Sequence, residues 1–118
     1  MIWELEHIQN FCKRLPQAEE CYPFGEETMV FKVQTKMFAL ISFDGSRFSI
    51  NLKNTPDKNI ELRELYSFII PGFHMNKKHW NTVILSTEAT DVLVKNLIVE
   101  SYKLVAPKAL SQTLDVKL

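Results

Sequence analysis

The residues best suited to chemistry lie close together in the segment from Gly72 to Leu85. No acidic residue occurs between positions 64 and 88, so any positive charge there is uncompensated by its neighbours along the chain. Ammonium groups pair with phosphate oxygens, imidazole can donate a hydrogen bond, and indole can stack on a base. The segment therefore favours binding of a polyanion over acid–base catalysis, and the side chains that would do so are His74, Lys77, Lys78, His79 and Trp80.

A hairpin is predicted here, with Lys77 and Lys78 at its tip, where they would meet phosphates. Asn76 and His79 could donate to the backbone or to base edges. Cations beside a second predicted hairpin would widen this patch if the sheet brings them to the same side, namely Lys36, Arg47 and Lys53. A structural role remains open for the same residues, because lysines at hairpin tips also keep a sheet edge from aggregating, and a strand tryptophan usually belongs to the core.

Catalytic and metal-binding patterns are weak. No GxSxG elbow occurs, three glycines cannot form a phosphate-cradling loop, and no nucleophile, base and orienting group can be named together. Cys12 falls on the buried stripe of a predicted helix, Cys21 has acidic neighbours, and neither belongs to a CxxC pair. We therefore expect no enzymatic activity, no bound metal and no cofactor.

Composition indicates one ordinary globular domain. The chain has 118 residues, of which 46% are hydrophobic, and its 14 basic and 14 acidic residues cancel. Binding to nucleic acid would thus rest on a local patch rather than on net charge. We find no signal-peptide pattern and no apolar run of about 20 residues, so we expect a cytoplasmic protein that does not enter a membrane.

The elements that must position these residues follow from periodicity and from turn signals. The segment 17–27 is predicted to be a loop, within which Tyr22–Gly25 either plugs the sheet edge or lines a cleft near the hairpin. Asp44–Gly45 indicates a type I′ turn, whereas Gln34–Thr35 is a poorer turn pair.

Helices are expected over 2–15, from Thr55 to before Pro71 and from Ser86 or Thr87 to Pro107. Strands are expected over 28–33, 36–43, 47–52, 69–73 and 79–85, and a loose tail or short docked turn over 106–118. This order predicts a single α+β domain over 1–118, with two layers: an antiparallel five-stranded sheet and helices packed on one face.

Five segments together resemble the MmcQ/YjbR family of small bacterial proteins: Pro23-Phe24-Gly25, Val30–Val33, Lys36–Leu40, Met75–Trp80 and Ser101–Val105. The resemblance spans about Phe11 to Val105. It implies an α-β-β-β-α-β-β-α architecture akin to the secretion-chaperone-like fold. It also implies a DNA-binding protein that contacts the duplex through paired hairpin wings.

Two functions therefore remain open. One is binding of double-stranded DNA through the basic hairpins. The other is a protein-interaction or chaperone-like module, in which an open sheet face or edge grips a peptide or a second copy of the chain.

Overall fold

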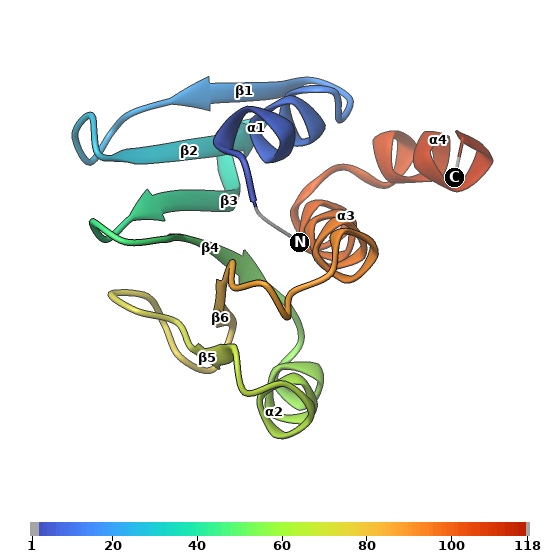
Figure 1. Ribbon diagram of the computed structural model, residues 1–118. Coiled ribbons are helices and arrows are strands. Elements are labelled where there is room, and N and C mark those ends of the chain that lie inside the picture. The colour runs from blue at the N-terminus through green and yellow to red at the C-terminus, as the bar shows by residue number, and fades with distance from the viewer. Residues whose placement is uncertain (1–2, 118) are drawn as a thin grey trace.

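The computed structural model describes residues 3–117, the side chains of residues 113–117 excepted. Within that range the chain forms an α+β domain in which an open antiparallel sheet is covered by helices, as predicted (Figure 1). The sheet has six strands rather than the predicted five. The elements are α1 (Leu5–Lys13), β1 (Ala18–Cys21), β2 (Thr28–Val33), β3 (Lys36–Phe43), β4 (Phe48–Lys53), α2 (Pro56–Leu65), β5 (Ile69–Pro71), β6 (Trp80–Ile84), α3 (Asp91–Val105) and α4 (Lys108–Lys117).

The sheet order is β1-β2-β3-β4-β6-β5, and every neighbouring pair is antiparallel. The additional strand, β1, occupies one edge, where it pairs only with β2. Its residues Glu19 and Glu20 show no hydrophobic alternation, because an edge strand at a sheet margin stays largely wet. The prediction of a loop over 17–27 is therefore wrong for residues 18–21.

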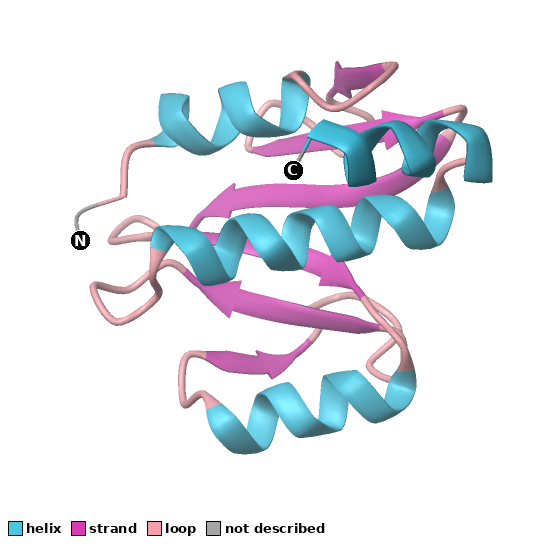
Figure 2. Ribbon diagram, turned by 90° about the vertical axis from the view of Figure 1, so that its right-hand side faces the viewer, coloured by secondary structure: helices cyan, strands magenta, loops and turns pink. Residues whose placement is uncertain are grey.

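All the helices lie on one side of the sheet (Figures 1 and 2). The main core fills the space between the helices and the sheet, and its buried residues come from every strand except β1 and from the helices α1, α2 and α3. The edge of the Phe38 ring packs against Tyr102 of α3 with centroids 5.3 Å apart. A smaller cluster of Val30, Leu40 and Trp80 lies on the opposite side, so Trp80 belongs to a core, as its strand position suggested. None of the described helices is long and apolar enough to cross a membrane.

The type I′ turn occurs at Gln34–Thr35 rather than at Asp44–Gly45, where it was predicted. Gln34 and Thr35 both have positive φ, at 47° and 71°, which is the type I′ conformation in spite of their poor propensity. The turn after β3 is instead a four-residue loop, in which only Gly45 has positive φ. Its Asp44 carboxylate accepts hydrogen bonds from the backbone N–H groups of Ser46 and Arg47 at 2.9 and 3.0 Å. The aspartate side chain thus replaces the tight turn that the Asp-Gly pair suggested.

Helix boundaries follow the side-chain caps. Thr55 caps α2, because its hydroxyl accepts from the Lys58 N–H at 3.3 Å and proline follows it, as expected. The cap of α3 is Thr90 rather than Ser86 or Thr87. The tail, expected to be loose or a short docked turn, is a ten-residue helix, α4, whose Leu110 packs on the main core.

Candidate nucleic-acid interface

The loop that joins β5 to β6, residues 72–79, folds back toward the uncovered side of the sheet (left in Figure 1). The backbone N–H of Phe73 donates to Thr82 Oγ1 at 2.9 Å, and the Phe73 carbonyl accepts from Asn51 Nδ2 at 3.4 Å. Asn51 and Thr82 are paired across β4 and β6 on that uncovered face. The loop is therefore attached to the body of the sheet.

Buried amides hold the other end of this loop. Asn59 of α2 is 1% exposed, and its Nδ2 donates to the carbonyls of Asn54 and Lys78 at 3.3 and 3.2 Å. Asn81 Nδ2 donates to the Asn59 carbonyl, and Arg63 donates to both Asn81 Oδ1 and the Lys77 carbonyl. Because buried amides that lose a partner cost about 1–3 kcal/mol each, this network fixes the position of the Lys77–Lys78 backbone.

Two of the predicted binding residues are used by the loop itself. The side-chain oxygen of Asn76 accepts from the N–H groups of Lys78 and His79 at 2.9 and 3.3 Å, which closes a turn. The ammonium of Lys77 donates to the Gly72 carbonyl at 3.1 Å. His79 is half-buried, and its carbonyl accepts from the Asn54 N–H. Of the loop residues predicted to bind, Lys78 is thus the exposed cation whose side chain forms no hydrogen bond or ion pair in the described part of the chain.

The strand register brings further lysines to this loop. Lys53 ends β4 and pairs with Trp80, the first residue of β6, so it lies beside the end of the 72–79 loop. The turn between β2 and β3 lies at the same end of the sheet (right in Figure 2), because β2 and β4 run in the same direction. We call this set the basic end: Lys32, Lys36, Lys53, Lys77 and Lys78. Glu19 lies opposite Lys32 on β1, but no ion pair neutralises a basic-end lysine among the described residues.

Arg47 does not join them. It precedes the first residue of β4, whereas Lys53 is the last. At about 3.3 Å per residue the two backbones are roughly 20 Å apart. Arg47 lies at the opposite end with Asp44, Glu88 and Asp91, so the sequence-based grouping of Arg47 with Lys36 and Lys53 was wrong. The length of β4 separates the two residues.

A groove crosses the uncovered face beside the basic end. We call it the open-face groove; its volume is about 490 Å³, and its main walls are Phe24, Phe43, Asn51, Phe73, Met75 and Thr82. Phe24 and Phe73 are 63% and 65% exposed, so they present their rings to solvent, whereas the Phe43 ring packs against Phe48 with centroids 4.8 Å apart, on the helix side of the sheet. Phe24 comes from the Tyr22–Gly25 segment and lines a cleft near the 72–79 loop, the second of the two placements considered for it. Sequence reasoning missed the groove as a whole, because its walls come from three separate connections.

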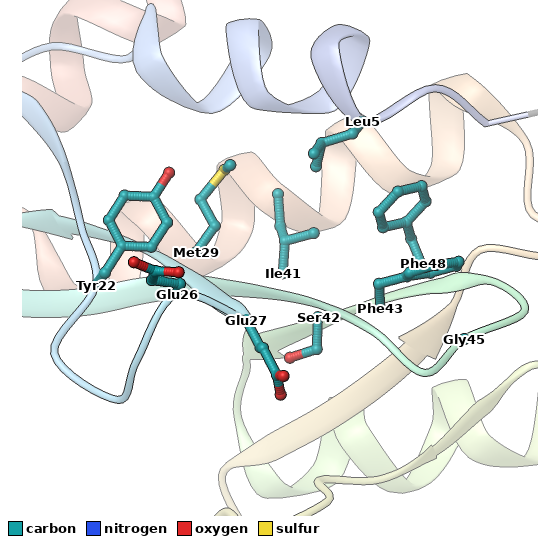
Figure 3. Close-up of a pocket in the computed structure, with 10 residues that line it drawn as sticks. All are labelled: Leu5, Tyr22, Glu26, Glu27, Met29, Ile41, Ser42, Phe43, Gly45 and Phe48. Atoms are coloured by element: carbon teal, nitrogen blue, oxygen red, sulfur yellow. The ribbon is translucent and has the colours of Figure 1, made fainter.

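A larger hollow of about 640 Å³ lies on the helix side, where Leu5 of α1 faces Met29, Ile41 and Phe48 (Figure 3). Glu26 and Glu27 are the charged residues in its lining. An apolar hollow with carboxylates repels phosphate, and it therefore does not extend the candidate interface.

Electrostatics distinguish the two ends of the sheet. Hydrogen bonds from the backbone N–H groups of Arg47 and Ser46 lower the pKa of Asp44, which keeps it ionised beside the groove. At the start of α3, partial burial acts to raise the pKa of Asp91, but hydrogen bonds from His7 and Lys95 outweigh it and lower that pKa. Asp91 is paired with those two side chains, so Asp44 is the carboxylate that brings negative charge to the groove.

The cysteines and histidines stay apart. Burial raises the pKa of the Cys12 thiol to about 12, so it is not a nucleophile. Among the described residues no group of three His, Cys, Asp or Glu side chains gathers where a metal ion could bind. His74 has a φ of 59° and its ring lies 4.0 Å from that of Phe73.

These features define a class: an α+β protein with a six-stranded antiparallel sheet, helices on one face, and a grooved, lysine-flanked opposite face. Comparison with known proteins identifies the family. The YjbR family model matches residues 13–104, and the chain belongs to that family.

Relatives share most of their length with it. The uncharacterised protein YbdF of Escherichia coli O157:H7 is 43% identical over 101 residues, which cover 85% of this chain and 82% of YbdF. The uncharacterised protein YjbR of E. coli K12 is 28% identical over 99 residues, 84% of each chain. The crystal structure of Deinococcus radiodurans DR2400, with a DUF419 domain, is similar with a TM-score of 0.84 and 34% identity, covering 97% of this chain and 89% of that one. A Pseudomonas syringae crystal structure shares the fold at a TM-score of 0.75 and 24% identity, over 86% of this chain and 98% of its own.

Proposed function

We propose that this protein binds nucleic acid through the basic end, without catalysing a reaction. The observation that carries the proposal is the convergence of Lys36, Lys53 and Lys78 from three separate connections onto one end of the sheet. A protein with balanced charge needs such a local concentration to attract a polyanion.

The arrangement suits phosphate contacts rather than base readout. Lysine is a compact point charge on a flexible stem, and it makes no planar bidentate contact of the kind that reads guanine. With three lysines at phosphates, the slope of log K against log salt is expected to be about −2 to −3. Affinity would then fall about 20- to 40-fold between about 50 and 200 mM salt.

The test compares removal of positive charge at the two ends of the sheet. Lys36→Gln/Lys53→Gln/Lys78→Gln is expected to abolish the salt-dependent binding of a fluorescein-labelled DNA measured by anisotropy, with the far-UV circular dichroism unchanged. Lys77 is left in place because its ammonium supports the loop. Arg47→Gln, a charge removed at the other end, is the control and should bind as the parent does. Binding that survives the triple substitution, or that is lost with Arg47→Gln, would contradict the proposal.

A protein partner is the second candidate, favoured by the exposed rings of Phe24 and Phe73 beside a sheet face that no helix covers. It predicts self-association or capture of a partner that does not weaken with salt. Light scattering after size exclusion, at low and high salt, measures this. A monomer at all concentrations would count against a second copy as the partner.

A further inference from the structure

The open-face groove lies next to the basic end on the same face of the sheet. Alternation along β4 places Asn51 and Lys53 on one face, because they are two residues apart. Their backbones are about 7 Å apart. Asn51 lines the groove, so a ligand in it reaches Lys53 without leaving that face.

The groove presents π-surface to solvent. Burying apolar area is favourable, and the rings of Phe24 and Phe73 in its lining, both more than half exposed, are an unpartnered surface. They stand in loops on opposite sides of the groove: Phe24 between β1 and β2, and Phe73 between β5 and β6. Every base has a π-face, so such rings accept bases with little regard to sequence.

The floor of the groove is polar. Thr82 Oγ1 donates to Asn51 Oδ1 and accepts from the Phe73 N–H. Asn51 Nδ2 donates one hydrogen bond within the described part of the chain, to the Phe73 carbonyl, and an amide nitrogen carries two hydrogens. Its second hydrogen, with the hydroxyls of Ser42 and Ser49 in the same lining, can meet the edge of a base.

The two sides of the open-face groove carry opposite charges. Lys53 and Lys32 are the basic-end residues that strand alternation places on the open face. Asp44, whose pKa is lowered, lines the opposite side of the groove. A phosphate chain would be attracted at the first side and repelled at the second. Only a short stretch can therefore occupy the groove.

From this juxtaposition, and resting on the proposed function, we propose that the ligand is single-stranded nucleic acid, with one or a few unstacked bases in the open-face groove and the adjoining phosphates on Lys53 and Lys78. A duplex keeps its bases stacked inside, where Phe24 and Phe73 cannot reach them. The 72–79 loop is attached to the sheet and does not project as a wing, so a single nucleic-acid strand can lie across the open face. The groove thus makes the lysines selective for unpaired strands.

The experiment measures anisotropy of a labelled 12-nucleotide thymidine strand and of a 12-base-pair duplex at low salt. The single strand is expected to bind more tightly. Phe73→Ala should weaken it about 5- to 150-fold, the loss of one stacked base, and leave any duplex binding unchanged. Leu65→Ala is the matched control, because Leu65 is also 63% exposed but lies on α2, away from the groove.

A second variant keeps the ring and adds a signal. Phe73→Trp should bind as the parent does, and its indole fluorescence should be quenched by the strand. If the duplex binds as tightly as the single strand and Phe73→Ala changes neither, the inference fails while nucleic-acid binding stands. If neither nucleic acid binds, both fail. If Phe73→Ala instead dissociates a dimer in light scattering, a second copy covers the groove and the inference is overturned.

Discussion

Ser101 of α3 ties the helix layer to the basic end, and its replacement by alanine should be costly. Its side chain is fully buried, and the hydroxyl donates to the Phe38 carbonyl at 2.6 Å while accepting from the Lys53 N–H at 2.9 Å. Phe38 is the extra residue of a bulge, at which the pairing of β2 with β3 shifts, so its carbonyl has left the regular ladder. Ser101 therefore supplies a partner that the sheet does not.

The magnitude follows from those two backbone groups. Leaving a buried donor or acceptor unpaired costs about 1–3 kcal/mol, with the lower value for the half-buried Lys53 N–H. We expect Ser101→Ala to lower the free energy of unfolding by about 2–4 kcal/mol, a large part of the stability of a small domain.

Urea unfolding followed by far-UV circular dichroism measures this, with the slope against urea unchanged. Ser67→Ala, on an exposed serine in the connection from α2 to β5, is the matched control and should shift stability by less than about 0.5 kcal/mol. A Ser101→Ala loss as small as that of the control would refute the reasoning, because it would mean that both backbone groups find other partners.

Three further predictions concern other parts of the molecule. Gly72→Ala should destabilise the protein by about 1–3 kcal/mol, since the new Cβ would lie 2.9 Å from both the Cβ and the carbonyl oxygen of Trp80; unfolding midpoints measure this, and an unchanged midpoint would show that the 72–79 loop yields freely. Cys12, with its pKa raised to about 12 by burial, should react with iodoacetamide at pH 8 only on unfolding, which mass spectrometry detects; modification in the native state would contradict its burial. Acid should destabilise the fold, because hydrogen bonds lower the folded-state pKa of Glu20 and Asp44 below their ordinary values of 4.5 and 3.8. A lowered pKa adds stability that is complete above the ordinary value and is lost as pH falls through the folded one. Thermal midpoints should therefore drop below about pH 4, and midpoints that stay constant down to about pH 2 would oppose this.

Much of the local structure could be predicted from the sequence. The amphipathic stripe of residues 94–105 predicted α3 and its buried face, because the spacing of apolar side chains alone decides which side of a helix turns inward. The Thr55-Pro56 pair marked the start of α2 for an equally local reason. The sequence did not predict the edge strand β1, since a strand that has one neighbour and is partly exposed to solvent needs no hydrophobic alternation.

The site depended on contacts between distant residues. Lys53 lies beside the 72–79 loop only because β6 inserts next to β4, and Ser101 meets a carbonyl 63 residues away. Arg47 belongs to the opposite end because it lies at the start of the strand that Lys53 ends, a separation that the predicted strand over 47–52 already implied. The sequence by itself determined three of the helices, the strands other than β1 and the presence of lysines and phenylalanines that could face solvent. Sheet order and register alone decided which of them share a face. The pairing of a strand with its neighbours fixes at which end of the sheet its charged residues lie.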